Sequence, residues 1–408
     1  MEFAHRFNPT SNTGAVSGEG FVTVRYGVSV PARVNALGNP ADGNEGAHQC
    51  ICAAIEERGG AFVEESDQLV LEVLERIEET EEFKTLKSEP FGTERLEYDG
   101  EYDLIKAAIN VMEKYSPTFA TRFQEQRVKI STWTDIPRLS GLGGSSVLIL
   151  AVLGALRAFY DLDERVHNDY FIAEITQRAE GKELGITCGF ADRYVPLLGD
   201  IAYVDFRGKL FHKEVKEEPY ATYEKLGSYV AELPLVIAST GVARDSGDVH
   251  GAMRPKYLAE YEQYERSGGQ KPFLVSIMEE IGATAWRGKF ALLENDWETF
   301  GELMNENHRL ADEMMRYCGF TGGAGPENNL LIEAALDHGA LGAKLTGAGA
   351  RGSVFALARP EKLDDMVAHL SRIAEENGLE NSLVRKCAIA RTGLTVWQCQ
   401  PSGPRRLP

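Results

Sequence analysis

The chain has 408 residues, a length that suits two domains better than a single hydrophobic core. Its 62 acidic and 43 basic side chains give a formal net charge of −19, which argues against a nucleic-acid-binding protein, because phosphate contacts need a basic face. We expect no membrane segment and no signal peptide, since no apolar run reaches spanning length and residues 1–6 lack the layout of a signal peptide. The six cysteines lack zinc-site spacing, so we expect reduced thiols in a cytoplasmic protein.

Hydrophobic periodicity predicts the elements of the first half of the chain. Residues 1–20 are polar and glycine-rich, and we expect them to be a loose N-terminal segment. The acidic run Glu75–Glu82 is interpreted as the solvated face of a helix. The other predicted elements are a strand Phe21–Val30, a helix near Ala47–Arg58 that ends at Gly59 and Gly60, a helix Tyr102–Tyr115 and a strand Arg127–Thr134.

The second half of the chain follows a charged, weakly periodic stretch at Lys213–Leu226. We place a domain boundary there, which divides the chain into an N-terminal domain of residues 21–215 and a C-terminal domain of residues 216–408. The remaining predicted elements are helix Asn168–Gly181, strands Ile201–Phe206 and Leu233–Thr240, helices Lys256–Glu265, Phe273–Leu293, Trp297–Cys318 and Asn328–His338, and strands Gly352–Ala358 and Leu394–Cys399.

A glycine- and serine-rich loop, Pro137–Ser146, stands directly before the apolar run Val147–Tyr160. Glycines allow the backbone to approach a ligand closely, and the start of a helix offers unpaired N–H groups to a phosphate. Ser145 or Ser146 could then cap the helix or hold Mg²⁺ through its hydroxyl. The segment alone is equally compatible with a tight turn and an N-cap.

This loop does not stand alone, because three segments resemble the motifs of the GHMP kinases in the family's order. They are Pro31–Asp42, the loop Pro137–Ser146 and Lys344–Ser353. The resemblance implies the α+β, two-domain GHMP kinase fold with the active site in the cleft between the domains. It also implies ATP as phosphate donor and Mg²⁺ as metal ion.

The resemblance assigns roles to individual residues. The segment Ala179–Asp192 is similar to a galactokinase segment, which implies that Asp192 is the catalytic base and Glu180 a Mg²⁺ ligand. Without the resemblance, Asp192 would be expected to pair with Arg193 or to cap a helix. Arg33 matches a motif arginine that keeps the base ionised, and Asp42 matches an aspartate that binds sugar hydroxyls. The residues expected at ATP are Pro137, Gly141, Leu142, Gly143, Gly144, Ser145, Ser146, Gly347 and Gly349.

Two details of the predicted ATP and metal site stay open from the sequence. Ser145 is the preferred hydroxyl ligand of Mg²⁺ and Ser146 the alternative, because Gly144 stands where the family has its first serine. Arg351 replaces a glycine of the third motif, and it is either neutral or reaches a phosphate.

Departures from galactokinase point to the substrate. The stretch Gly38–Asp42 lacks the glutamate and histidine of galactokinases and resembles that of the plant glucuronokinases, as does Asp245–His250 followed by Arg254. This resemblance implies phosphorylation of the anomeric hydroxyl of a uronic acid to give a sugar 1-phosphate. Arg244 and Arg254 would hold the carboxylate, or they make surface or ATP contacts. The alternatives are galactose, a heptose phosphate or a non-catalytic sugar and ATP sensor. We expect a monomer or homodimer without a nucleic-acid or membrane partner.

Overall fold

The fold is taken from a computed structural model. It describes residues 24–399 apart from 78–79, 93, 138–139, 188, 210–214, 216–219, 243–246 and 348–351, together with residues 405 and 407. The described chain folds into two mainly antiparallel β-sheets and ten α-helices. These elements form two parts, each with its own sheet and its own helices.

The larger sheet has eight strands and is built around two long strands, β1 and β2. Its strand order is β12-β1-β2-β5-β3-β4. In addition, β6 pairs with the first residues of β2, and β7 pairs with β6. β3 and β5 run parallel, and the other pairs of the sheet are antiparallel. The strands are β1 Arg25–Leu37, β2 Gln49–Glu65, β3 Leu69–Ile77, β4 Glu82–Phe91, β5 Val128–Thr134, β6 Ile201–Asp205, β7 Thr222–Lys225 and β12 Thr395–Cys399.

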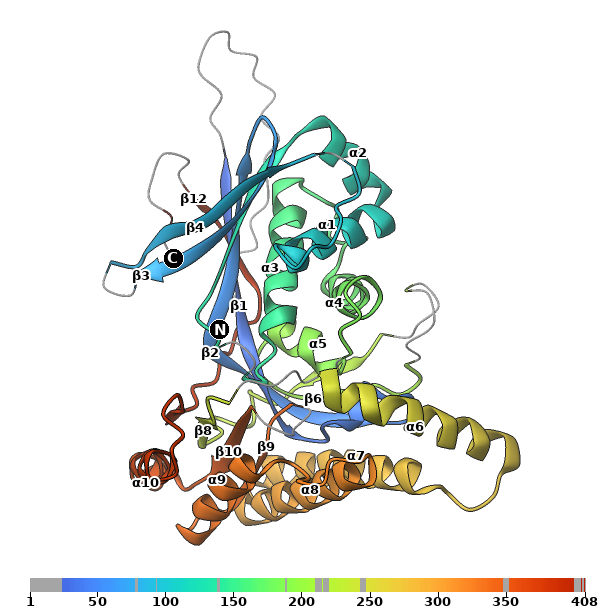
Figure 1. Ribbon diagram of the computed structural model, residues 1–408, viewed down its shortest axis with the longest axis vertical. Helices are drawn as coiled ribbons and strands as arrows, with labels where there is room; N and C mark the ends of the chain where they lie inside the picture. The colour runs from blue at the N-terminus through green and yellow to red at the C-terminus, as the bar shows by residue number, and fades with distance from the viewer. Residues whose placement is uncertain are drawn as a thin grey trace.

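Five helices cover one face of this sheet (Figure 1). α3 is apolar on all sides and is buried between the sheet and the other helices, as expected for a helix without a polar face. The helices are α1 Asp103–Tyr115, α2 Pro117–Glu125, α3 Gly144–Phe159, α4 Asp169–Arg178 and α5 Ala191–Leu198, and a π-helical turn Ala179–Glu183 extends α4.

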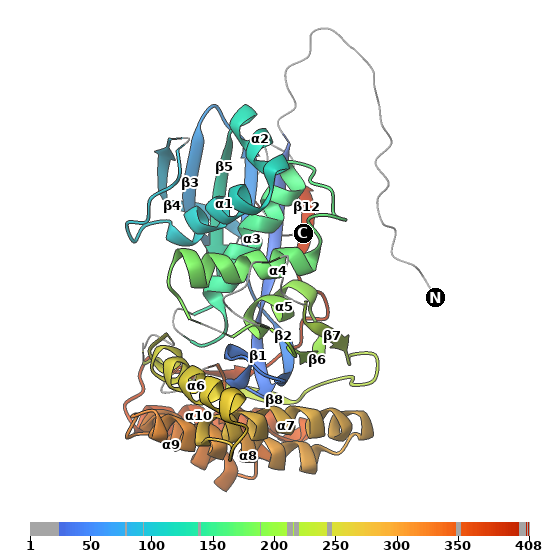
Figure 2. The same ribbon diagram turned by 90° about the vertical axis from the view of Figure 1, so that its right-hand side faces the viewer.

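The smaller sheet has the order β11-β8-β10-β9 and lies at one end of the molecule with the remaining helices (Figure 2). Its strands are β8 Leu235–Ser239, β9 Gly342–Leu345, β10 Ser353–Leu357 and β11 Leu383–Lys386. The helices are α6 Gly247–Ser267, α7 Phe273–Glu294, α8 Trp297–Tyr317, α9 Pro326–Asp337 and α10 Leu363–Glu376. The chain then returns to the larger sheet, where β12 pairs with β1. The division at residue 215 stays a proposal, and the pairing of β7 and β12 shows that the larger sheet draws strands from both sides of it.

Two predicted helices are wrong. The predicted helix Ala47–Arg58 lies in β2, and Gly59 and Gly60 do not end a helix but continue the strand. A Cβ atom on Gly60 would lie 2.6 Å from Nε1 of Trp133, so this glycine lets an indole lie flat across the strand. The acidic run Glu75–Glu82 belongs to the ends of β3 and β4, a ribbon whose second strand is largely exposed. The remaining predicted helices and strands overlap observed elements, and α10 was not predicted.

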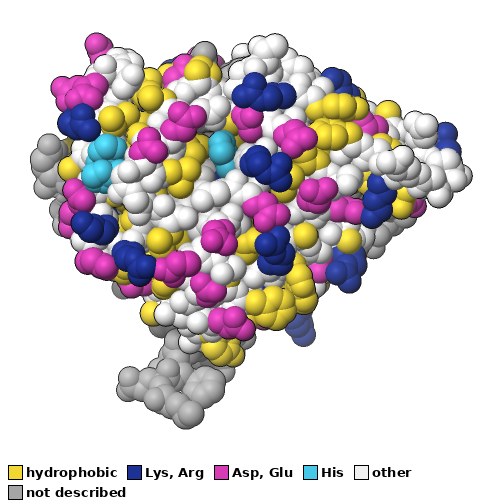
Figure 3. Space-filling model, turned by 90° about the horizontal axis from the view of Figure 1, so that it is seen from below, with side chains coloured by type: hydrophobic (Ala, Val, Ile, Leu, Met, Phe, Trp, Pro, Cys, Tyr) yellow, Lys and Arg dark blue, Asp and Glu magenta, His cyan; other side chains and the backbone are white. Residues whose placement is uncertain are grey.

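The surface carries both signs of charge. Over the face seen in Figure 3, acidic and basic side chains alternate without a continuous basic area. Among the described residues, no helix is long and apolar enough to cross a membrane.

Candidate active site

A cavity of about 600 Å³ is bounded by strands of the larger sheet, the start of α1 and the start of α3, and α6 and the segment after β9 contribute His250 and Gly347 to its wall. Its wall has an apolar part, built from the ends of β3 and β5 and the start of α1, and a polar part that holds two aspartates, an arginine and a histidine. The cavity therefore offers room for a flat apolar group at one end and for a polar ligand at the other. The polar part is lined by Arg33, Asn35, Asn39, Asp42, Asp192 and His250.

The glycine-rich loop forms the wall between these two parts. Gly143 has a φ of +83°, a conformation that favours glycine, and turns the chain into α3. The predicted residues Pro137, Gly141, Leu142, Gly143, Gly144 and Ser145 all line the cavity, and so does Gly347 from the third motif. Ser146 is 1% exposed and does not line it, and Gly349 and Arg351 lie outside the described residues. The first turn of α3 thus directs its free N–H groups toward the cavity.

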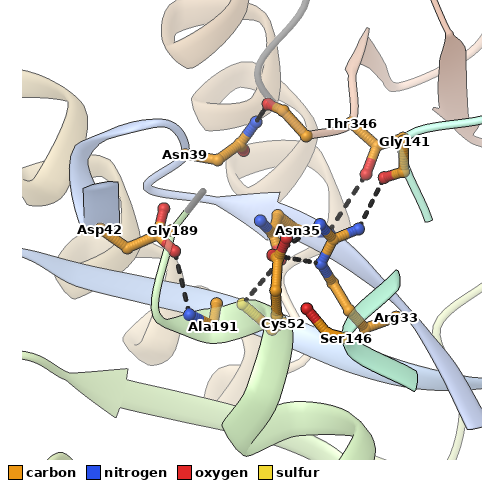
Figure 4. Close-up of polar contacts among 12 residues, drawn as sticks. Arg33, Asn35, Asn39, Asp42, Cys52, Gly141, Ser146, Gly189, Ala191 and Thr346 are labelled. Atoms are coloured by element: carbon orange, nitrogen blue, oxygen red, sulfur yellow. Dashed lines mark hydrogen bonds and ion pairs between the residues drawn. The ribbon is translucent and has the colours of Figure 1, made fainter. Parts of the chain in front are cut away.

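Arg33 and Asp192 form an ion pair on the cavity wall. Nε of Arg33 donates to Oδ1 of Asp192 at 2.8 Å, and a terminal nitrogen lies 2.5 Å from the same oxygen. The guanidinium also donates to the carbonyl of Gly141 at 2.6 Å (Figure 4). Burial alone would lower the pKa of Arg33, and the attraction of Asp192 outweighs it, so the pKa is raised. The arginine is therefore a fixed cation between the carboxylate and the glycine-rich loop.

Glu180 lies behind this wall and holds both serines of the loop. Ser145 and Ser146 each donate to one of its carboxylate oxygens at 2.7 Å, so neither serine caps α3, whose N-cap is Gly143. Arg193 lies 2.5 Å from Oε2 of Glu180, and both side chains are buried. Arg193 therefore pairs with Glu180 and not with Asp192. Without the family resemblance, the sequence would have favoured a pair of Arg193 and Asp192 or a helix cap. Ser145 is the member of the group that reaches the cavity.

Asp42 stands near Asp192 on a short 3₁₀ turn, Ala41–Gly43, that follows β1. Its Oδ2 accepts from the backbone N–H of Ala191 at 3.0 Å (Figure 4). Burial, and then the repulsion of Asp192, raise the pKa of Asp42 to about 6. A carboxylate that burial and one neighbouring charge disfavour is suited to accept hydrogen bonds from hydroxyl groups of a ligand.

The first and third motifs are tied together behind Asp42 by Lys344. Its ammonium donates to the carbonyl of Asn35 at 3.1 Å and to Oδ1 of Asn39 at 2.5 Å. Asn39 in turn donates to the carbonyl of Gly347 at 2.7 Å. Burial lowers the pKa of Lys344 to about 7. The sequence analysis did not assign a role to this lysine, although it is the first residue of the third motif.

Of the two predicted carboxylate-binding arginines, the structure describes only Arg254, which does not line the cavity. Arg254 donates to the carbonyl of Gly43 at 2.9 Å and lies 2.8 Å from Oε1 of Glu45, so it braces the turn that carries Asp42. Arg244 lies outside the described residues. His250, four residues before Arg254 on α6, does line the cavity. It belonged to the singled-out segment Asp245–His250 but was not selected from the sequence.

Comparison with known families fits this architecture and site. Residues 103–200 match the model described as GHMP kinases N terminal domain, and residues 290–375 match the one described as GHMP kinases C terminal. Each half of the chain contains one of these matches and the three motifs lie around one cavity, so the chain carries the N- and C-terminal domains of the GHMP kinases. The predicted family and the α+β two-domain fold are confirmed, and the protein is a phosphotransferase with a hydroxyl acceptor.

Its relatives include sugar kinases of several kinds. Glucuronokinase 1 of Arabidopsis thaliana is 28% identical over 351 residues, which cover 85% of this chain and 90% of the relative. D-glycero-alpha-D-manno-heptose 7-phosphate kinase of Campylobacter jejuni is 25% identical over 300 residues, or 74% of this chain and 78% of that one. The fold is similar to that of Lactococcus lactis galactokinase complexed with galactose, with a TM-score of 0.69, 18% identity, and coverage of 91% and 95% of the two chains. The protein is accordingly a sugar kinase of the GHMP family.

Proposed function

We propose that the protein transfers the γ-phosphoryl group of ATP to the anomeric hydroxyl of a uronic acid and releases a sugar 1-phosphate. The observation that carries the proposal is the Arg33–Asp192 pair, which lies on the wall of the same cavity as Asp42 and the glycine-rich loop. The similarity to a glucuronokinase over most of both chains supports the choice of a uronic acid.

In the proposed reaction, Asp192 accepts the proton of the attacking hydroxyl. A sugar hydroxyl is a weak nucleophile until its proton is taken up as the bond to phosphorus forms. Arg33 holds the carboxylate in place through its contacts to Oδ1, and its link to Gly141 places its positive charge beside the loop that would bind the phosphates. The pair can therefore favour both the base and the transferring group.

The nucleotide is assigned to the loop and the apolar part of the cavity. The N–H groups at the start of α3 would hold the phosphates, and the apolar residues near Leu104 and Trp133 would cover the base. Residues 21–215 would then supply most of the ATP site, and residues 216–408 would close the sugar side.

The residues fit a Mg²⁺ ion of the kind that phosphoryl transfer uses. No group of three or more histidine, cysteine or carboxylate side chains gathers as a metal cage in the described chain. Mg²⁺ at phosphates needs only one or two protein oxygens, and the Ser145 hydroxyl and Glu180 carboxylate lie 2.7 Å apart at the loop. When bound, the ion would neutralise charge on the phosphates. Ser145 and Glu180 would hold it, and Ser146 and Arg193 would fix Glu180.

On the sugar side, Asp42 would accept hydrogen bonds from hydroxyl groups. Arg254 would act on the sugar through the turn it braces, because it is engaged by Glu45 and Gly43. The role of Arg244 as a partner for the carboxylate stays a prediction.

Release of ADP with Mg-ATP tests the proposal against glucuronate, galacturonate, galactose, mannose, a heptose phosphate and mevalonate. Turnover on a uronate, with phosphate at the anomeric carbon by ³¹P NMR, is the expected result. Turnover only on the heptose phosphate, which the Campylobacter jejuni relative makes the second candidate, would refute the uronic acid and keep the kinase. Binding of ATP and sugar without turnover would indicate a sensor.

A further inference from the structure

His250 is the one histidine among the described lining residues of the cavity. It lies in the first turn of α6 and is 5% exposed, and it faces the cavity together with Asp42 and Asp192. The described cavity wall carries only two side chains that can bear positive charge, Arg33 and this histidine. Arg33 is committed to Asp192, which leaves His250 as the other side chain of this kind on the described wall.

One nitrogen of the His250 ring has no structural hydrogen bond to account for its burial. Its Nδ1 is buried and has no hydrogen-bond partner among the described residues. A buried polar atom without a partner costs free energy, so a histidine is a poor choice here if it serves only to fill space. Nδ1 of the nearby His48 is also buried without a partner, but its Nε2 lies 3.0 Å from the carbonyl of Glu45 and 3.3 Å from the hydroxyl of Tyr257, and the residue does not line the cavity. His250 differs from it because its ring lines the cavity.

The position of the ring is fixed by the turn that carries Asp42. A Cβ atom on Gly43 would lie 2.9 Å from Cε1 of His250, so the glycine lets the imidazole pack directly against the turn. One helical turn later, Arg254 donates to the carbonyl of the same Gly43. α6 therefore grips the turn through one side chain and places the other beside Asp42.

We infer that His250 is a sugar-binding residue, whose ring hydrogen-bonds an oxygen of the substrate close to the hydroxyl that Asp192 activates. The inference rests on the proposed function, because it takes the polar end of the cavity as the sugar site. Burial lowers the pKa of His250 to about 4, with the attraction of Asp192 opposing this and Arg193, Arg254 and Arg33 adding to it. The ring is therefore neutral at pH 7 and has one donor and one acceptor nitrogen. A hydroxyl group, which also donates and accepts, matches both.

The test compares His250→Ala with His48→Ala, a matched change at a buried histidine that does not line the cavity. With the sugar that the wild-type protein phosphorylates, His250→Ala is expected to raise the KM of the sugar about five- to tenfold, the loss of one neutral hydrogen bond, and to leave the KM of ATP within twofold. His250→Asn, which restores a polar group near Nδ1, is expected to recover part of this loss. His48→Ala is expected to lower the thermal midpoint without changing the KM of the sugar.

A series of monodeoxy analogues of that sugar separates contact from packing. The penalty of His250→Ala is expected to disappear on the analogue that lacks the contacted oxygen and to persist on the others. An unchanged sugar KM, or an equal penalty on every analogue and on ATP, would overturn the inference. If the wild-type protein uses a neutral sugar, the uronic acid proposal fails while the test of His250 proceeds with that sugar. A protein that neither phosphorylates nor binds any sugar of the panel would overturn both.

Discussion

Replacing Asp192 by asparagine tests the base and can be worked out from the geometry of its contacts. Both contacts from Arg33 reach one oxygen, Oδ1, at 2.8 and 2.5 Å. An asparagine oxygen can accept both, so the arrangement of the wall is expected to survive while the negative charge and the proton acceptor are lost. Removal of a general base lowers kcat by about 10² to 10⁴. Because the loss acts on the transition state, the affinity for ATP should change little.

The stability of this variant follows from the same contacts. Complete loss of one partner from a buried ion pair costs about 3–5 kcal/mol. Since the hydrogen bonds can persist and the carboxylate is partly exposed, we expect the smaller loss of about 1–3 kcal/mol in unfolding free energy.

The assay combines ADP release, ATP binding by calorimetry and urea unfolding, with Asp200→Asn as the matched control. Asp200 also pairs with an arginine, Arg391, at 2.7 Å, but it lies away from the cavity. The control is expected to lose stability and keep kcat within about threefold, the scatter of a surface pair. Turnover of Asp192→Asn at the wild-type rate would refute the base assignment, and so would a kcat loss matched by Asp200→Asn.

Three further predictions concern the loop, the sugar side and the tie between motifs. Ser145→Ala should raise the Mg²⁺ concentration needed for half-maximal rate at least about tenfold, whereas Ser146→Ala should mainly lower the thermal midpoint; the reverse order in a Mg²⁺ titration would contradict the assignment. Because the pKa of Asp42 is raised to about 6 in the fold, against 3.8, its contribution to stability is complete below about pH 4 and falls as the pH rises through 6. Urea unfolding from pH 4 to 7 should show that the wild-type protein loses up to about 3 kcal/mol of unfolding free energy and that Asp42→Asn does not. The same pH dependence of unfolding free energy in both proteins would contradict this prediction. Lys344→Met should cost about 2–4 kcal/mol because it removes three hydrogen bonds to buried oxygens, and an unchanged unfolding midpoint would show that the tie is unimportant.

Helices with one apolar face were predictable from the sequence, and buried strands were not. α1 and α8 show clear helical spacing and were found within one or two residues. β2 is buried on both faces over most of its length, so the alternation that marks a strand is missing. Its alanines and glutamates then favour a helix on propensity alone. Pairing with β1 and β5 overrides this local preference.

The prediction for the β3–β4 ribbon was wrong for the opposite reason. β4 is exposed along most of both faces, so its polar side chains carry no period of two. In contrast, α10 was missed although the signal was present, since Leu363, Met366, Val367 and Leu370 recur at helical spacing.

The residues of the site could be predicted from the sequence, but the contacts between them could not. The three motifs predicted Arg33 and the glycine-rich loop, and the segment Ala179–Asp192 predicted Asp192; the fold brings all of them to one cavity. The sequence does not show which acidic side chain lies next to which arginine in the folded chain. The pairing of Glu180 with Arg193 could therefore not be predicted. The same limit applies to α6, where charge chemistry favoured Arg254 although His250 lines the cavity.

The return of β12 to the larger sheet has a consequence for how the protein is made. β1 is among the first strands to be synthesised, yet its edge at Arg25–Ser29 stays unpaired until residues 395–399 have left the ribosome. An open strand edge is a template for pairing with other chains, and domains that finish late are the ones that depend on chaperones. Translation speed and chaperone supply should therefore affect the yield of this protein more than that of a kinase whose first domain closes on itself.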